Sequence, residues 1–206
     1  VTLFVVIDPP GCVPIFSSLT AGTTARHRVD MAVRSSLIAG AVLVAFALGG
    51  EAFLSALGIT LPAFKIAGGV MVFLIAIDMV FEKRTQRRES RAEEVKSAAD
   101  AAGKPLEEED ISVFPMAIPM LAGPGSIASV MLLSARTGGD YTKEAVVLAA
   151  LIAVLGLTFL SLLAAGPIMK LMGAKFEGAL TRLLGVVLAA LAAQFVVDGI
   201  RQSFNL

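Results

Sequence analysis

The residues of this sequence that could do chemistry gather at two points, each combining proline and glycine with a polar side chain. The first break, residues 8–14, reads DPPGCVP, and the second break, residues 121–126, reads LAGPGS. Proline removes a backbone donor and clashes with the preceding turn, while glycine relaxes the backbone, so each cluster should interrupt a helix. An interrupted helix presents unpaired amides with partial positive charge, which suit a carboxylate ligand.

Asp8 is the charged residue of the first break, and two interpretations of it stay open. In one, Asp8 is an N-cap and Pro9 occupies the first helical position, a common helix start. In the other, burial raises the pKa of Asp8 so that it exchanges a proton, or its carboxylate holds a substrate ammonium. An ionised carboxylate at the centre of a membrane helix costs at least about 2.5 kcal/mol, so either role must compensate that cost.

Other polar and small residues of the apolar segments are weaker candidates. Ser126 could cap a helix or bind a ligand, and the glycines near residue 68 could pack helices closely or line a site. The candidate binding residues are Asp8, Pro10, Gly11, Cys12, Pro14, Gly68, Gly69, Gly123, Pro124, Gly125 and Ser126. The candidate coupling or gating residues are Asp8, Lys65, Asp78, Arg182, Gln194 and Asp198.

Enzyme chemistry has no support in the sequence. It contains no nucleophile and base pair, no metal-ligand cluster and no nucleotide-binding loop, and its one histidine, His27, lies in a basic segment. We therefore expect no enzymatic activity, no cofactor or metal site and no nucleic-acid partner. Membrane lipid, a coupling ion such as H⁺ or Na⁺ and, in a homo-oligomer, further copies of the chain are the expected partners.

The elements that must position these residues are membrane-spanning helices. Apolar residues make up 56% of the chain and charged residues only 17%, and residues 111–135 and 145–169 contain no charged side chain. A spanning helix needs about 20 predominantly apolar residues, and backbone groups in hydrocarbon must be satisfied within the segment. The sequence predicts an all-α membrane protein with six spans, near residues 1–21, 34–57, 61–81, 111–135, 144–171 and 177–200.

Depth places both breaks near the middle of the membrane. Gly123 is the central residue of the uncharged run 111–135, and a rise of 1.5 Å per residue puts it about 18 Å from either end. A helix over residues 9–19 would reach from the same depth to a basic loop. Spans 1 and 4 are therefore predicted to be discontinuous at mid-membrane.

The two halves of the chain, residues 1–81 and 111–206, share spaced matches. Pro10-Gly11 precedes Pro124-Gly125 by 114 residues, and residues 69–76 precede the similar residues 185–192 by 116. Because each half has three spans, such a repeat would lie in the membrane in opposite senses. The sequence thus predicts two inverted three-helix repeats.

Residues 82–110 separate the halves and carry many charges of both signs. We interpret them as a solvated cytoplasmic loop, partly a helical extension of the third span. Twelve Lys and Arg residues fall in connections on this side of the six-span layout and three on the other. The imbalance predicts that this side is cytoplasmic and that both termini lie outside.

Accessibility of a single cysteine placed at Ser203 tests this orientation. A membrane-impermeant thiol reagent should label the variant in intact cells, because residue 203 follows the last span on the outer side. Labelling that appears only after the membrane is breached would reverse the assignment.

Three segments resemble signatures of the MarC family of membrane proteins. They are LFVVIDPPGCVPIF at residues 3–16, AFKIAGG at 63–69 continuing through IAIDM at 75–79, and PMLAGPGSI at 119–127. The family includes ion-driven carriers of small neutral amino acids such as glycine and alanine. The resemblance implies a prokaryotic inner-membrane symporter of that substrate class, working by alternating access with the two breaks as its site. A non-transporting scaffold or stress-response protein acting through residues 82–110, and an exporter of another small solute, remain alternatives.

Overall fold

The computed structural model describes residues 1–101 and 110–204, and within them it leaves out the side chains of residues 100 and 170–177. Residues 102–109 of the predicted loop therefore lie outside the described part. All regular elements of the described part are helical. In chain order they are α1 (Thr2–Ile7), α2 (Pro9–Leu19), α3 (Ala25–Ala56), α4 (Leu61–Val80), α5 (Lys83–Ala101), η2 (Ser112–Leu121), α6 (Pro124–Ala135), α7 (Tyr141–Leu163) and α8 (Ala165–Phe204).

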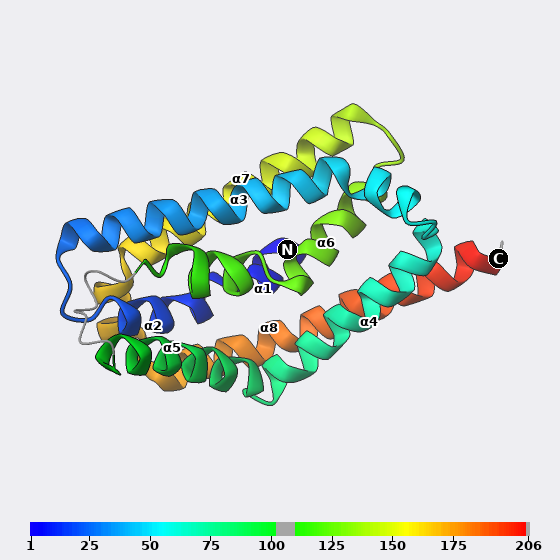
Figure 1. The fold of residues 1–206 in the computed structure, drawn as a ribbon. Helices are drawn as coiled ribbons and strands as arrows, with labels where there is room; N and C mark the ends of the chain where they lie inside the picture. The colour runs from blue at the N-terminus through cyan, green and yellow to red at the C-terminus, as the bar shows by residue number, and fades with distance from the viewer. Residues whose placement is uncertain (102–109, 205–206) are drawn as a thin grey trace.

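Long helices frame the molecule and short ones fill its centre (Figure 1). Helix α3 lies beside α7, and α4 pairs along its length with α8. The short helices α1, α2, η2 and α6 lie between these two pairs, and most residues of α1 and α2 are buried. The two breaks thus lie inside the helix bundle, and irregular backbone is tolerated at membrane depth where it is buried in protein or lines a water-filled cavity.

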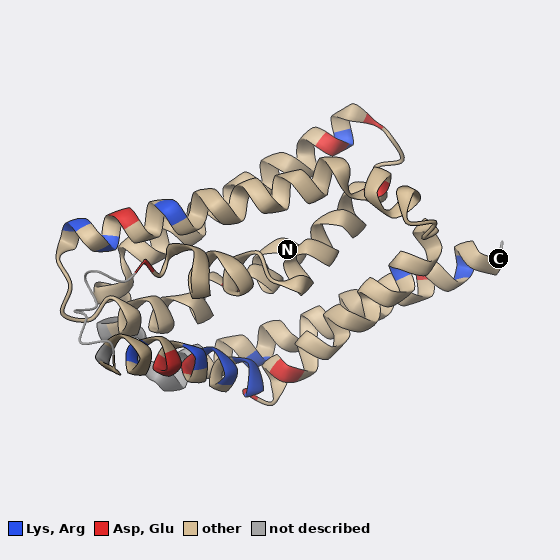
Figure 2. Ribbon diagram, in the orientation of Figure 1, with Lys and Arg blue, Asp and Glu red and all other residues tan. Residues whose placement is uncertain are grey.

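The long helices have the composition of membrane spans. Five segments are long and apolar enough to cross a membrane, and a sixth is added if η2 and α6, which meet at a bend of 52°, count as one span. Charged residues gather toward the two ends of α3, α4 and α8 and toward the start of α7, and they leave the middle stretches of these helices uncharged (Figure 2). Large apolar side chains such as Leu74, Ile152 and Leu160 are exposed on these stretches, as expected for surfaces that face lipid.

Three predicted boundaries differ from the structure. The fifth span was expected to reach residue 171, but α7 ends at Leu163 and α8 begins at Ala165. Pro167 lies in the first turn of α8, where its missing amide costs nothing, so Gly166-Pro167 marks a helix start that the apolar run conceals. Helix α3 begins nine residues before the predicted 34 because the Thr24 side chain accepts a hydrogen bond from the His27 amide.

The segment 82–110, interpreted from the sequence as a solvated loop that is partly a helical extension of the third span, is helical over most of its described part. Residues 83–101 form the separate helix α5, which follows a turn at Glu82 with a positive φ of 59° and packs on α2. Arg88, Ala92 and Ala99 on its inner face are buried. The high charge density concealed this one face, because a charged helix looks the same in sequence whether or not it has a partner.

Small residues let α4 and α8 approach closely. A Cβ atom built on Gly69 would lie 2.8 Å from Val196 Cγ2 and 3.0 Å from the Ala192 carbonyl oxygen. On the opposing helix, a Cβ atom on Gly185 would lie 3.1 Å from both Val80 Cγ2 and the Ala76 carbonyl oxygen. Both glycines are therefore required by the helix contact.

Replacing Gly69 by Ala should destabilise the fold, since over-packing of a close contact costs about 1–3 kcal/mol. Thermal unfolding in detergent can be followed with a thiol-reactive dye, because Cys12 is fully buried and is the chain's single cysteine. Gly156→Ala is the control, as nothing lies within 4 Å of a Cβ atom at Gly156. We expect a lower midpoint for Gly69→Ala alone, and equal midpoints would contradict the close packing.

Candidate functional site

The first break is organised around Asp8. This residue takes a left-handed conformation (φ 59°, ψ 66°), which Asp tolerates better than most residues, so α1 ends and α2 begins without a connecting loop. Asp8 Oδ1 accepts a hydrogen bond of 3.2 Å from the Gly11 amide, and Pro9 is the first residue of α2. The N-cap interpretation of Asp8 is confirmed, while a role in proton exchange or ammonium binding stays a prediction.

Helix α5 closes the other side of the first break. Arg88 Nη1 donates to Asp8 Oδ2 at 2.8 Å, and both side chains are nearly inaccessible, with 6% and 1% of their surface exposed. Arg84 Nη2 donates to the Val6 carbonyl oxygen at 2.6 Å, and Arg88 Nη2 lies 3.5 Å from that of Ile7. The carbonyls of Val6 and Ile7, the last two residues of α1, and the first amide of α2 thus have partners.

Glycine at position 11 is required by this arrangement. A Cβ atom there would lie 2.2 Å from Asp8 Oδ2 and 2.7 Å from Arg88 Nη1. Because the Gly11 amide already donates to Asp8, it has no free hydrogen for a ligand. The first break therefore does not offer the open half-helix end that its sequence predicts.

The second break is open. Helix α6 begins at Pro124 after an extended Gly123 (φ −78°, ψ 170°), and no described side chain caps its first turn. Its first backbone bond runs from the Ile127 amide to the Gly123 carbonyl oxygen, so the amides of Gly125 and Ser126 precede the helical ladder. The preceding segment η2 is irregular, since Pro115 and Pro119 push Phe114 and Ile118 into extended conformations.

A cavity of about 360 Å³ lies at the second break and is bounded by α4, α5, α6 and the end of α1. We call it the arginine cavity. Its wall includes Gly123 to Ser126 of the second break, Val6, Asp78 and four guanidinium groups, those of Arg84, Arg87, Arg88 and Arg91.

The arginine cavity carries an excess of positive charge. Arg87 pairs with Asp78 through two hydrogen bonds, and Arg88 pairs with Asp8. Neither Arg84 nor Arg91 pairs with a carboxylate of the described residues. Burial, followed by repulsion from Arg88, lowers the pKa of Arg84 to about 10, so this guanidinium remains charged at neutral pH. The cavity is therefore suited to an anionic group.

The predicted binding residues divide between the two breaks. Gly123, Pro124, Gly125 and Ser126 line the arginine cavity, whereas Asp8, Pro10, Gly11, Cys12 and Pro14 are not part of its wall. The thiol of Cys12 is buried and lies 3.6 Å from the Ile7 carbonyl oxygen. Gly68 packs on Leu132 of α6 and Gly69 on α8, and neither lines the cavity.

The predicted coupling and gating residues form two groups at opposite ends of the α4–α8 pair. At the α5 end, Asp78 pairs with Arg87 and Arg182 with Glu82. At the other end, Asp198 accepts hydrogen bonds from Arg136 and Gln194, and Lys65 donates to Gln202 at 2.8 Å. Both ends of this helix pair are thus tied by polar contacts.

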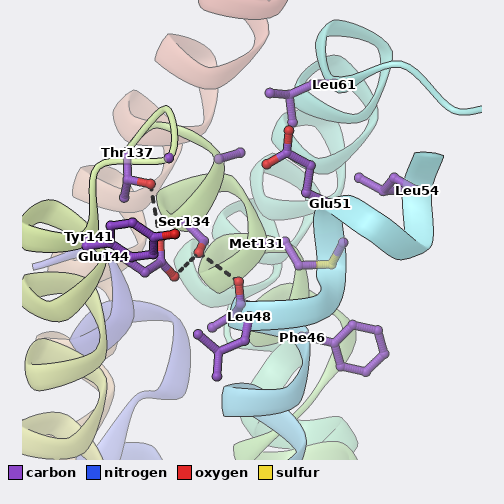
Figure 3. A pocket seen from close by; sticks show the side chains of 13 residues that line it. Phe46, Leu48, Glu51, Leu54, Leu61, Met131, Ser134, Thr137, Tyr141 and Glu144 are labelled. Carbon is purple, nitrogen blue, oxygen red and sulfur yellow. Dashed lines mark hydrogen bonds between the residues drawn. The ribbon is translucent and has the colours of Figure 1, made fainter.

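A second cavity, of about 250 Å³, lies between α3, α6 and α7 (Figure 3). The hydroxyls of Ser134 and Thr137 both donate to Glu144, and Glu51 lies on the other side of the space. Its two carboxylates give this cavity the opposite charge from the arginine cavity, so it disfavours an anionic ligand. No group of three or more His, Cys, Asp or Glu side chains in the described residues could hold a metal ion.

The arginines of α5 are the site residues that the sequence prediction missed. Residues 84, 88 and 91 recur at helical spacing, on the face that also carries Ala92 and Ala99. This pattern was readable, but it does not say which surface the face would meet.

The helical fold with its apolar spans and charged cavity defines a multi-pass integral membrane protein. The chain belongs to the MarC family of integral membrane proteins, whose match covers residues 1–204. The resemblance predicted from the three sequence segments is confirmed.

Relatives align along almost the whole chain. The UPF0056 membrane protein MJ1677 of Methanocaldococcus jannaschii is 38% identical over 200 residues, which cover 97% of this chain and 93% of the relative. The UPF0056 inner membrane protein YhgN of Escherichia coli is 35% identical over 201 residues, covering 98% and 93%. The UPF0056 membrane protein YvbG of Bacillus subtilis is 34% identical over 204 residues, covering 99% and 93%. No solved structure matches this chain.

Replacing Arg88 by Leu should destabilise the protein strongly, by about 3–5 kcal/mol, because it leaves Asp8 as an uncompensated buried charge. Thermal unfolding reported by Cys12 measures the effect. Arg34→Leu is the matched control, since the Arg34 and Asp110 side chains of that ion pair are 59% and 52% exposed and such pairs contribute about 1 kcal/mol or less. The double variant Asp8→Asn/Arg88→Leu should recover part of the lost stability. Equal unfolding midpoints for Arg88→Leu and Arg34→Leu would exclude a structural role for the buried pair.

Proposed function

We propose that this protein is a secondary transporter of a small neutral amino acid of the glycine and alanine class. The carboxylate of the amino acid binds in the arginine cavity. The observation that carries the proposal is the convergence of an uncapped helix start with four arginine residues on one cavity. Half-helix starts that face anionic substrate groups are a recurring device of secondary transporters. Membership of the MarC family supports the same function.

The dimensions and polarity of the cavity suit such a substrate. A space of about 360 Å³ is at the small end of ligand sites, appropriate for glycine or alanine rather than a large solute. The guanidinium groups and amides supply donors for the carboxylate. Asp78, in the cavity wall, supplies an acceptor for the ammonium group.

An inverted repeat would provide alternating access, and helix contacts support it. Gly69 meets Ala192 and Val196, while Gly185 meets Ala76 and Val80. A shift of 116 residues converts the first set of contacts into the second, as expected for two halves related by a pseudo-two-fold axis. Rocking of the halves about the two breaks, at mid-membrane, would expose the site to each side in turn.

Orientation and coupling complete the proposal. In this proposal α5 and the opening of the arginine cavity face the cytoplasm of a prokaryotic cell and both termini lie outside its inner membrane, because basic residues are enriched on the α5 side. The coupling ion is H⁺ or Na⁺. Asp8 is the candidate proton carrier, and because Arg88 holds its carboxylate, it can take up a proton only when that ion pair opens during the cycle.

Uptake by the purified protein in liposomes tests the function. Radiolabelled glycine and alanine should accumulate above equilibrium under an inward proton or Na⁺ gradient, and should only exchange without one. Protein-free liposomes give the background. Absence of both uptake and exchange for these substrates would reject amino-acid transport.

The Asp8→Asn variant in the same liposomes separates binding from coupling. Asparagine can still cap α2 but cannot carry a proton, and it leaves the buried Arg88 without its carboxylate partner. In the folded fraction, in which Cys12 stays protected from thiol reagents, exchange should persist while accumulation driven by a pH gradient is lost. Full accumulation by this variant would remove Asp8 from the coupling mechanism.

A further inference from the structure

The two breaks differ at one position, and the residue there determines whether a carboxylate of the protein itself occupies the helix start. The shift of 114 residues that relates Pro10 and Gly11 to Pro124 and Gly125 places Asp8 on Ala122. In the first break the Asp8 carboxylate fills the start of α2, bonded to the Gly11 amide and to Arg88. Ala122 has no carboxylate, and no described side chain caps α6. The second break therefore lacks the anionic group that completes the first.

The surroundings of this helix start are built for a ligand. Ser126 is only 2% exposed and lines the arginine cavity, yet its hydroxyl forms no hydrogen bond within the described residues. Arg91 is half-buried, lines the same cavity and has no acceptor in the described part of the chain. The Ser126 hydroxyl, the Arg91 guanidinium and the uncapped amides can therefore all donate to one anionic ligand in the cavity.

We propose that the substrate carboxylate occupies at α6 the place that the Asp8 carboxylate occupies at α2. The amides of Gly125 and Ser126 donate to one side of the carboxylate, as the Gly11 amide does to Asp8. Arg91 is its ion partner and corresponds in role to Arg88, and the Ser126 hydroxyl adds a third contact. This assignment rests on the proposed transport function and specifies how that same site recognises its substrate.

The contacts of Arg84 and Arg88 at the first break explain why a substrate site is expected at the second break alone. Arg84 and Arg88 are engaged with the carbonyls of Val6 and Ile7 and with Asp8, which leaves Arg91 as the guanidinium available to a ligand. Charge-assisted bonds from a guanidinium and from helix-start amides are the strong kind. The requirement is for a carboxylate on the ligand, and the ammonium group contributes less.

Equilibrium binding of radiolabelled glycine to the full-length protein in detergent tests the assignment. Arg91→Gln should weaken binding by about tenfold or more, and Arg91→Lys should restore part of the affinity. Lys83→Gln is the matched control: it removes the same charge from α5 but lies outside the arginine cavity, and its affinity should be unchanged. Equal binding by Arg91→Gln and Lys83→Gln would overturn the assignment.

Ala122→Asp provides the complementary test, because it supplies an internal carboxylate at the position equivalent to Asp8. Glycine binding should be lost in this variant while Cys12 stays protected from thiol reagents, which shows that the fold persists. Ala122→Asn, of the same size but uncharged, should retain more affinity than Ala122→Asp. Equal glycine affinity in folded Ala122→Asp and in the unmodified chain would contradict the proposal.

Competition against bound glycine distinguishes failure of this assignment from failure of the proposed function. Acetate, which keeps the carboxylate, should compete, and glycinamide, which lacks it, should not. If glycine is transported but glycinamide competes as well as acetate, the carboxylate site is wrong and the transport function stands. If glycine does not bind but radiolabelled acetate does, in an Arg91-dependent manner, the site stands and the amino-acid substrate is rejected.

Discussion

The structure depends on a buried ion pair between two segments that are 80 residues apart, Asp8 in the first break and Arg88 on α5. A carboxylate enclosed by apolar helices must be paired, and this pair attaches α5 to the bundle at the point where α1 and α2 meet. Arg84 strengthens the attachment by capping the Val6 carbonyl. One interaction thus satisfies the interrupted backbone, orients a charged helix and forms a wall of the arginine cavity.

The same interaction makes the two breaks unequal. Asp8 and the arginines satisfy both helix ends of the first break, so its amides are occupied by the protein itself. The second break has alanine at the corresponding position, and its helix start opens on a positively charged cavity. A single side chain thus leaves the start of α2 occupied by a carboxylate and the start of α6 uncapped.

Close helix packing supplies the rigid frame around this site. Gly69 and Gly185 allow α4 and α8 to meet at backbone distance, and ion pairs join charged residues near both ends of that pair. The long helices have continuous backbone hydrogen bonding, whereas the short helices end where proline and glycine prevent it. Motion of one half against the other would therefore concentrate at the breaks and leave the helices intact.

The sequence by itself determined the membrane class, the approximate spans, the family and the position of both helix interruptions, because long apolar runs and proline-glycine clusters act locally. It also gave the N-cap as one of two interpretations of Asp8, because Asp before Pro-Pro-Gly is a local helix-start signal, and the structure confirmed that cap. Only the tertiary structure decided that Gly11 has no free amide, that Gly68 and Gly69 pack rather than line the cavity, and that α5 supplies four arginines to it. The physical reason is that the partner of a buried charge is chosen by long-range packing, and neither Asp8 nor Arg88 carries any local signal of the other.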